Sequence, residues 1–366
     1  MPVSSQIVSQ DFVQSADLAS TLRSRLVASG ANRQIRGRFD PLGESSDPAA
    51  SIDPARHRVD KLQVLETMLT ATRVRSQGRM IRAAVREFSP DVVHALRIPY
   101  EGIIALQAIS DVPVALSCWG QDFSRQAARD PLLAMWVRRL LPKAAGIHVD
   151  ARVDLERARS YGLRSVPHIH AAGNFGIRAT DFPAADRRGP YTVLYPRGLR
   201  QYVRHELFLS MVEDLASQEN LQFVGVGLQD DPKSAAVARA YPDRLTLLPE
   251  LPRADYLAVL RTADVVVSPG LSDGTPNSLL EAMASGASII AADIPSVRDL
   301  LGTDQKSNLL DPEDPQQWAA TLRQLMPTLE DRRRESEAYS RVPDIYNAVT
   351  NTARVLDFYD AVISTQ

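Results

Sequence analysis

The sequence contains a single cysteine in 366 residues, Cys118. One thiol excludes an intramolecular disulfide and is typical of a protein of the reducing cytoplasm. The stretch PVALSCWG around it predicts a strand in a buried core. His, Cys and acidic residues do not gather at the spacing of metal ligands, so we expect no metal and no other cofactor.

Long apolar runs are also missing. No run approaches the roughly 18 residues that span a bilayer, and MPVSSQIVSQDF lacks the basic start and apolar stretch of a signal peptide. We therefore expect a cytoplasmic protein. Two arginine-rich stretches, RVRSQGRMIRAAVREF and WVRRLLPK, leave peripheral contact with an anionic membrane as an alternative to an ordinary solvated helix face.

The small net charge of −2 conceals an uneven distribution along the chain. Residues 1–190 hold 26 Lys and Arg against 19 Asp and Glu, a charge of +7, and the remainder carries −9. The basic half is compatible with anionic lipid or phosphate, and a solvated arginine-rich surface is the alternative. We expect no nucleic-acid partner.

At 366 residues and 44% hydrophobic content, the chain is long enough for two domains with buried cores and a ligand cleft between them. Strand-like runs alternate with helical patterns, which predicts α/β domains with parallel sheets. The predicted strands of the first half lie at 91–96, 113–118, 146–151 and 166–171. Those of the second half are YTVLYP, LQFVGVG, RLTLLP, DVVVSP and ASIIAAD. The start of the chain is predicted as a short strand at SQIVSQ, a helix at 17–30 and a loop at 40–60.

The alternating pattern breaks at FPAADRRGP, residues 182–190, which predicts a linker. We therefore place a first domain at 1–185, a second at 186–342, and a last helix, about 343–366, packed back on the first. In HELFLSMVEDLAS, apolar residues recur at three- and four-residue steps. This spacing predicts one helix face packed on a sheet, made of Leu207, Phe208, Met211, Val212 and Leu215.

The most informative stretch is DVVVSPGLSDGTPNSLLEAMASGASIIAAD, residues 264–293. It predicts a strand buried on both faces, a loop of turn residues, a short helix and a second strand. Thr275 and Pro276 are predicted as the N-cap and the first helical residue, which leaves the amides of Asn277 and Ser278 as free donors. Because a helix start carries partial positive charge, this loop predicts a phosphate site at the end of the strand.

Glu281 lies in the same short helix, six residues after Thr275 and about 9 Å farther along its axis at ~1.5 Å per residue. A carboxylate at this position can accept both hydroxyls of a ribose whose phosphates lie at the helix start. On the residues alone, the alternative is an exposed Glu281 on the helix surface and Asp273 as an acid of the turn.

The stretch SDGTPNSLLEAMASGASIIAADIPSVRDLL resembles the carboxyl-domain signature of the retaining glycosyltransferases of family 4. These enzymes have the GT-B fold, an α/β architecture of two facing Rossmann-like, doubly wound domains with a cleft between them. The family pattern is an acid, seven residues and then Glu followed by A-M-A-x-G, which Asp273, Glu281 and EAMASG match. The resemblance implies that Glu281 holds the nucleotide ribose, and Asp273 stands where the family most often has a Glu that contacts the donor sugar. It also implies that the diphosphate and donor sugar meet Gly274, Thr275, Pro276, Asn277 and Ser278.

A second group of phosphate ligands is expected in YPRGLRQYVRHEL, where the family usually has Gly-Arg, a short loop and Lys-Gly. Arg197 and Arg204 resemble the two basic positions, and Arg200 is a further candidate. Arginine can cover a diphosphate with paired hydrogen bonds. Three arginines beside a helix start would repel one another without an anion, which favours this interpretation over a surface cluster.

In the first half, SPDVVHAL resembles the family's strand that ends in His, and ALSCWGQDF its strand followed by Gly-x-Asp. His94, Trp119, Gly120 and Asp122 are therefore candidates for contacts with the donor sugar or the acceptor. A histidine at a strand end is more often structural, which is the alternative for His94. The stretch AAGNFGIRATDF resembles the family's Asn-Gly loop before the linker, whereas the family's Gly-rich acceptor loop is not visible in VSQDFVQSADL.

The resemblance implies transfer of a sugar from a nucleotide diphosphate to an acceptor hydroxyl, with retention of configuration and without a metal. The acceptor would be a glycan, a lipid-linked molecule or a small molecule, and Asp273, Arg197, Arg204 and His94 are the catalytic candidates. Two alternatives stay open. One is a sugar-nucleotide 2-epimerase of the same fold, and the other is a nucleotide-sugar-binding subunit without activity, which the shorter Asp273 and the missing Gly-rich loop would explain.

Overall fold

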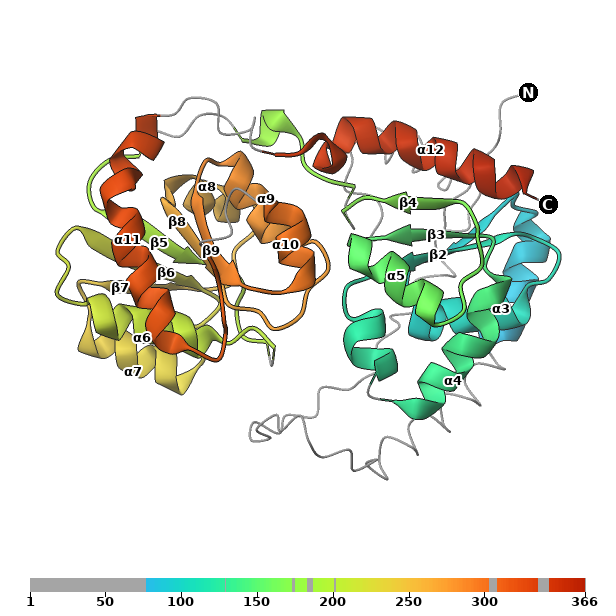
Figure 1. Ribbon diagram of the computed structural model, residues 1–366, viewed down its shortest axis with the longest axis horizontal. Helices are drawn as coiled ribbons and strands as arrows, with labels where there is room; N and C mark the ends of the chain where they lie inside the picture. The colour runs from blue at the N-terminus through green and yellow to red at the C-terminus, as the bar shows by residue number, and fades with distance from the viewer. Residues whose placement is uncertain are drawn as a thin grey trace.

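The computed structural model describes residues 77–128, 130–172, 175–182, 187–200, 202–302, 308–334 and 342–365. These residues form two parallel sheets with helices packed on them (Figure 1). The strand, helix and loop predicted for residues 1–60 lie outside the described residues. So does the boundary predicted between residues 185 and 186, which stays a prediction.

The first sheet has the strand order β1-β2-β3-β4, and all its pairings are parallel. Every residue of β2 and β3 is buried, as the apolar runs predict for central strands of a parallel sheet. The four predicted strands are confirmed, each shorter than expected: β1 (Val93–Ala95), β2 (Val114–Cys118), β3 (Gly146–Val149) and β4 (His168–His170). The helices of this part are residues 77–88, α3 (Ile103–Ala108), α4 (Pro131–Leu140) and α5 (Arg152–Ser160), with single turns at Ile98–Gly102, Asp122–Ala127 and Leu141–Lys143.

The second sheet has the order β10-β9-β8-β5-β6-β7, again with parallel pairings. Its strands are β5 (Tyr191–Tyr195), β6 (Leu221–Val226), β7 (Leu245–Leu248), β8 (Val265–Ser268), β9 (Ser288–Ala292) and β10 (Leu309–Leu310). Its helices are α6 (His205–Leu215), α7 (Pro232–Ala240), α8 (Arg253–Thr262), α9 (Asn277–Ala284), α10 (Pro295–Leu301) and α11 (Pro315–Arg334). The chain order reverses between β5 and β8, and ligands of such sheets bind outside the carboxyl ends of the strands at this point.

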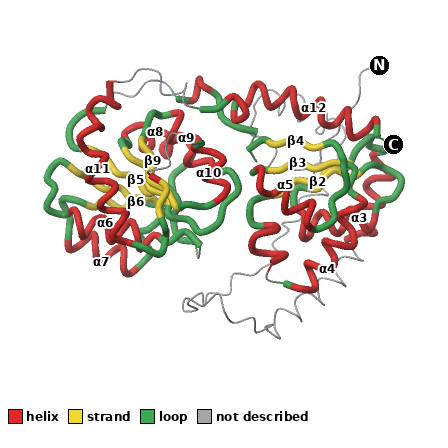
Figure 2. The backbone as a smooth tube through the Cα atoms, viewed as in Figure 1, coloured by secondary structure: helices red, strands yellow, loops and turns green. Residues whose placement is uncertain are grey.

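The second sheet separates two apolar cores. On one face α6 and α11 pack on the sheet, and the five residues predicted for the apolar face of α6 are all at most 2% exposed, which confirms that prediction. On the other face α8, α9 and α10 form a second cluster around Leu279, Leu280 and Ile289. Figure 2 shows this layered arrangement of helices and strands.

The last helix, α12 (Ala348–Ser364), follows the second domain in the chain but packs on the first sheet (Figure 1). Phe358 and Val362 lie directly on Gly146 of β3, where a Cβ atom would be 2.4 Å from Val362 Cγ2. The two chain segments that cross between the sheets meet in a bridge between Ile177 and Asn347, beside single turns at Ala179–Asp181 and Asp344–Tyr346. The crossings therefore lie side by side.

None of the described helices combines the length and the apolar character that crossing a membrane requires.

Candidate functional site

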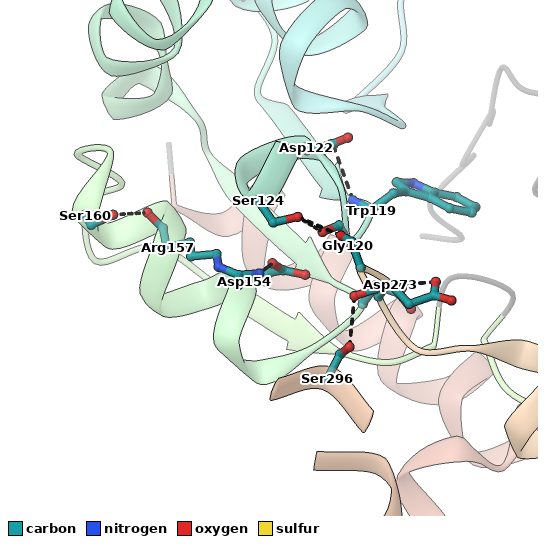
Figure 3. Close-up of polar contacts among 12 residues, drawn as sticks. Trp119, Gly120, Asp122, Ser124, Asp154, Arg157, Ser160, Asp273 and Ser296 are labelled. Atoms are coloured by element: carbon teal, nitrogen blue, oxygen red, sulfur yellow. Dashed lines mark hydrogen bonds and ion pairs between the residues drawn. The ribbon is translucent and has the colours of Figure 1, made fainter. Parts of the chain in front are cut away.

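The loops that follow β2 and β8 lie side by side, with Gly120 close to Asp273 (Figure 3), and the loop after β3 also reaches the loop after β8. Gly120, after β2, lies against Gly274, after β8, so closely that a Cβ on Gly120 would be 1.9 Å from the Gly274 amide nitrogen. Ser124 Oγ donates to Gly120 O at 2.7 Å and lies 3.1 Å from Ser272 Oγ of the opposite loop. The candidate residues Gly120 and Gly274 are therefore in backbone contact, and only glycine leaves room for it.

Thr275 is bound across this boundary by Asp150, which directly follows β3. The Thr275 amide donates to Asp150 Oδ2 at 2.9 Å, and the Thr275 hydroxyl donates to the Asp150 carbonyl. The predicted N-cap role of Thr275 is wrong, because α9 begins at Asn277 and its N-cap is Pro276 without a side-chain cap. The hydroxyl that would cap the helix is engaged by the other domain.

The start of α9 offers free amides, as the sequence predicts. Asn277 is exposed and Ser278 half-buried, and Leu279 is the first residue of this stretch whose amide donates to a carbonyl, that of Pro276. Among the described residues no acceptor is recorded for the amides of Asn277 and Ser278. Two donors and the positive end of the helix dipole therefore remain for an anion.

Asp273 forms an ion pair with Arg197, which follows β5. Asp273 Oδ1 accepts the Gly274 amide at 3.0 Å, and its carbonyl accepts the Ser296 hydroxyl at 2.9 Å (Figure 3). Arg197 and Asp273 come from β5 and β8, the two strands at which the chain order reverses. Both side chains are 19% exposed, so the pair is accessible from the boundary between the sheets.

Glu281 is buried, with a residue exposure of 4%, and the alternative of an exposed surface acid is wrong. Its Oε1 accepts Arg253 Nη1 of α8 at 2.6 Å, and Tyr256 also hydrogen-bonds the carboxyl. Burial raises the pKa of Glu281, while Arg253 opposes this change. A buried carboxylate held by a guanidinium that is itself 53% exposed is suited to exchanging that partner for a ligand.

Arg204 lies at the start of α6 in the left-handed conformation, with φ 48° and ψ 44°. Its guanidinium pairs with Glu206 and donates from Nη1 to Glu313 Oε1 at 2.7 Å, while Arg200 is exposed. Arg197 and Arg204 do not depend on an external anion for compensation, because acids of the chain itself pair with them: Asp273 with Arg197, and Glu206 and Glu313 with Arg204.

Asp122 is 1% exposed and joins the loops that follow β1 and β2. Its Oδ2 accepts the amide of Ile98 at 3.1 Å and that of Trp119 at 3.3 Å. Burial raises the pKa of Asp122 to about 7, and in α5 it raises that of Asp154 to about 6. Asp122 therefore orders the loop that carries Trp119 and Gly120, and its predicted ligand contact stays a prediction.

His94 is directed to α12 rather than to the other candidates. Its Nδ1 lies 2.7 Å from the Tyr359 hydroxyl and its Nε2 lies 2.9 Å from Ser117 Oγ. Ser117 Oγ lies 2.9 Å from Nδ1 of His148, whose Nε2 lies 2.9 Å from the Ala171 carbonyl. This chain of hydrogen bonds across the first sheet favours the structural alternative for His94.

Three functional candidates escaped sequence reasoning: Asp150, Arg253 and Tyr256. Asp150 follows a buried strand at the carboxyl end of a parallel sheet, the same signal that indicates Asp122, so the sequence could have revealed it. Arg253 and Tyr256 lie in α8 and meet Glu281 only through tertiary packing. Among the described residues, no group of three or more His, Cys, Asp or Glu could hold a metal ion.

Comparison with known proteins agrees with this architecture. Residues 178–341 match the family model of glycosyl transferases group 1, and residues 19–174 match that of a glycosyl transferase 4-like domain. A GDP-mannose-dependent alpha-mannosyltransferase of Mycolicibacterium smegmatis is 26% identical over 255 residues, 64% of either chain. A D-inositol 3-phosphate glycosyltransferase of Mycolicibacterium vanbaalenii is 32% identical over 98 residues, 27% of this chain and 22% of the relative. The chain thus spans less than two thirds of the length of these relatives.

Solved structures share the fold at low sequence identity. Sucrose-phosphate synthase from Thermosynechococcus elongatus superposes with a TM-score of 0.66 at 17% identity, covering 88% of this chain and 83% of that one. HepE of Anabaena in complex with UDP gives a TM-score of 0.62 at 13% identity, covering 76% and 80%. The predicted GT-B fold is confirmed. With two family models that follow each other along the sequence, the chain belongs to the group 1, family 4-like glycosyltransferases.

Proposed function

We propose that the protein transfers a hexose from a nucleotide-diphosphate donor to an acceptor hydroxyl with retention of configuration. One observation carries the proposal: a buried carboxylate, Glu281, lies in a helix whose free amides open at the point where the strand order of the second sheet reverses. This arrangement suits a nucleotide whose ribose binds Glu281 and whose diphosphate lies at the start of α9.

In this proposal the donor replaces the protein partners of Glu281 and Arg197. Arg253 leaves Glu281 when the ribose hydroxyls bind, and the freed guanidinium lies beside the nucleotide. Arg197 is paired with Asp273 and is available to the diphosphate from the same loop region. Each exchange replaces a bond within the protein by one to the donor.

The chemical step requires stabilisation of the negative charge that develops on the leaving diphosphate. The chain supplies positive groups for this purpose: the start of α9, Arg197, and Arg204 at the start of α6. Asp273 would contact the donor sugar, and the close approach of Gly120 and Gly274 would exclude water from the reacting atoms. The acceptor hydroxyl is expected to enter from the first sheet.

The test measures binding first and chemistry second. Isothermal titration with UDP and GDP should give binding that E281Q weakens about tenfold, since one charged acceptor is replaced by a neutral amide. The matched control is E330Q, in α11. Wild-type protein that binds neither nucleotide, or an E281Q variant with unchanged Kd, contradicts the proposed donor site.

Chemistry is then followed by NMR with the UDP- or GDP-sugar that binds. Release of nucleotide with transfer of the sugar and unchanged anomeric configuration supports the proposal. Conversion of the donor without an acceptor indicates a 2-epimerase, and binding without any release indicates a subunit that lacks activity.

We also propose a cytoplasmic protein whose first domain contacts a membrane surface to reach a lipid-linked acceptor. Met80 and Met135 are 70% and 52% exposed, in the helix at residues 77–88 and in α4, whose last turn contains Arg138 and Arg139. Exposed apolar side chains beside arginines suit an anionic surface. Salt-sensitive binding to vesicles that contain phosphatidylserine tests this contact, and equal recovery with neutral vesicles contradicts it.

A further inference from the structure

Asp150 occupies the donor loop of the opposite domain. It follows β3 directly, is 6% exposed, and its carboxylate accepts the Thr275 amide at 2.9 Å while its carbonyl accepts the Thr275 hydroxyl. The Thr275 amide lies two residues before α9, next to the free amides of Asn277 and Ser278. In this structure a negatively charged oxygen of the first domain therefore lies where the proposed function places a negatively charged oxygen of the donor.

No room remains for both. A Cβ on Gly274 would lie 1.9 Å from Asp150 Oδ2, and a Cβ on Gly120 would lie 1.9 Å from the Gly274 amide nitrogen. An atom as small as a methyl carbon thus overlaps the protein on this side of the loop. A phosphate oxygen can reach the Thr275 amide only after Asp150 has moved away.

Charge leads to the same conclusion. An amide hydrogen makes one strong hydrogen bond, so two anionic oxygens cannot share it. A carboxylate at 6% exposure beside a diphosphate also adds a repulsion that the low dielectric of a buried site strengthens. Asp150 and the donor are therefore mutually exclusive at this amide.

We propose that Asp150 is an internal competitor of the donor diphosphate, a latch on the Thr275 amide that the donor must displace. The proposal rests on the proposed donor site at α9. Arg253, which competes for Glu281, lies in the same domain as Glu281, whereas Asp150 comes from the other domain. Asp150 therefore couples donor binding in the second domain to a residue of the first.

The size of the effect follows from the fraction of protein in which Asp150 has left the Thr275 amide. The apparent Kd equals the intrinsic Kd divided by that fraction, so weakening the latch tightens binding. Loss of one charge-assisted hydrogen bond corresponds to about a tenfold change. The gain should appear in the association rate constant, because Asp150 no longer contacts the loop in the bound state.

The experiment compares wild type with D150A and D150N, and uses D360A as a matched control, since Asp360 is an exposed residue of α12. The probes are UDP and GDP, whose Kd is measured by calorimetry and whose rate constants are measured by stopped-flow fluorescence. We expect D150A to lower the Kd about tenfold through faster association, D150N to lower it about threefold, and D360A to leave it unchanged.

A Kd that is unchanged or higher in D150A overturns the latch, because a residue that positions the loop for the donor would have that effect. If D150A does not fold, as judged by its thermal melt, the isosteric D150N decides by the same criterion. Failure of the proposed function gives a different result: wild type then binds neither nucleotide, and E281Q has no effect.

Discussion

Replacing His94 tests the hydrogen-bonded chain across the first sheet. The Ala171 carbonyl can only accept, so His148 donates from Nε2, and its neutral Nδ1 accepts the Ser117 hydroxyl. Ser117 then accepts His94 Nε2, and His94 Nδ1 accepts the Tyr359 hydroxyl. The chain runs in one direction, from α12 to the loop after β4, and both imidazoles must be neutral.

Acid therefore destabilises the folded protein at these groups. Burial lowers the pKa of His94 to about 3 and that of His148 to about 4, from an ordinary 6.5. Below pH 6.5 the unfolded chain binds protons that the folded one does not, so the free energy of unfolding falls as the pH falls toward 4. At pH 5.5 the loss from His94 is about 1.4 kcal/mol. The raised pKa values of Asp122 and Asp154 increase the free energy of unfolding as the pH falls. The pH dependence of wild type alone therefore sums opposite contributions, and a variant is needed to isolate that of His94.

The variant H94Q isolates the contribution of His94, because the effects of other groups cancel between variant and wild type. At pH 7.5 the loss of two hydrogen bonds should destabilise H94Q by about 2 kcal/mol. At pH 5.5 wild type has itself lost about 1.4 kcal/mol of unfolding free energy through His94, which H94Q lacks. The difference between the two proteins should therefore shrink to about 0.6 kcal/mol. Urea unfolding followed by tryptophan fluorescence measures both values, with the exposed His168 replaced in H168Q as control. A difference that is the same at both pH values refutes the neutral, one-directional chain.

Three further substitutions probe the fold and the site. R333A removes a two-pronged ion pair with Asp264, which is 3% exposed, and should lower the free energy of unfolding by about 3 kcal/mol in urea. G120A places a methyl group against the Gly274 backbone, so the two loops must move apart, and it should reduce sugar transfer at least tenfold, measured as kcat. R204A should reduce kcat by about a hundredfold while shifting the melting temperature by only a few degrees, because the ion pairs of Arg204 are partly exposed.

Each of these has a control. R298A removes an exposed ion pair with Asp293 and should leave both stability and kcat nearly unchanged. An R333A variant as stable as R298A contradicts the structural role of Arg333. Full activity in G120A shows that the close contact is dispensable, and equal kcat in R204A and wild type removes Arg204 from the catalytic candidates.

Patterns within one element predicted the fold well. The three- and four-residue spacing of α6 and the apolar runs of β2, β3 and β8 depend on local periodicity, and the structure buries these residues as expected. The site is less visible in the sequence. The partner of Glu281 comes from α8 and that of His94 from α12, and no local pattern encodes such pairings.

The inaccurate predictions for Thr275 and for the arginines after β5 share a physical cause. Thr275 has the chemistry of an N-cap, but the first domain offers its amide and hydroxyl two stronger acceptors on Asp150. Arg197 looks uncompensated in the sequence because its partner Asp273 is far along the chain, and so is Glu313, the second partner of Arg204. Tertiary contacts override local preference at the boundary between the domains, where the candidate site lies.

The packing of α12 on the first sheet affects how the protein is made. Ala115, Ile169 and Phe175 are covered by Phe358 and Val362, which the ribosome adds about 190 residues after β4. At 5 to 20 residues per second, this apolar face stays exposed for roughly 10 to 40 s before α12 has been synthesised. During synthesis the second domain can bury the core beneath α6 and α11 before the first domain covers this face.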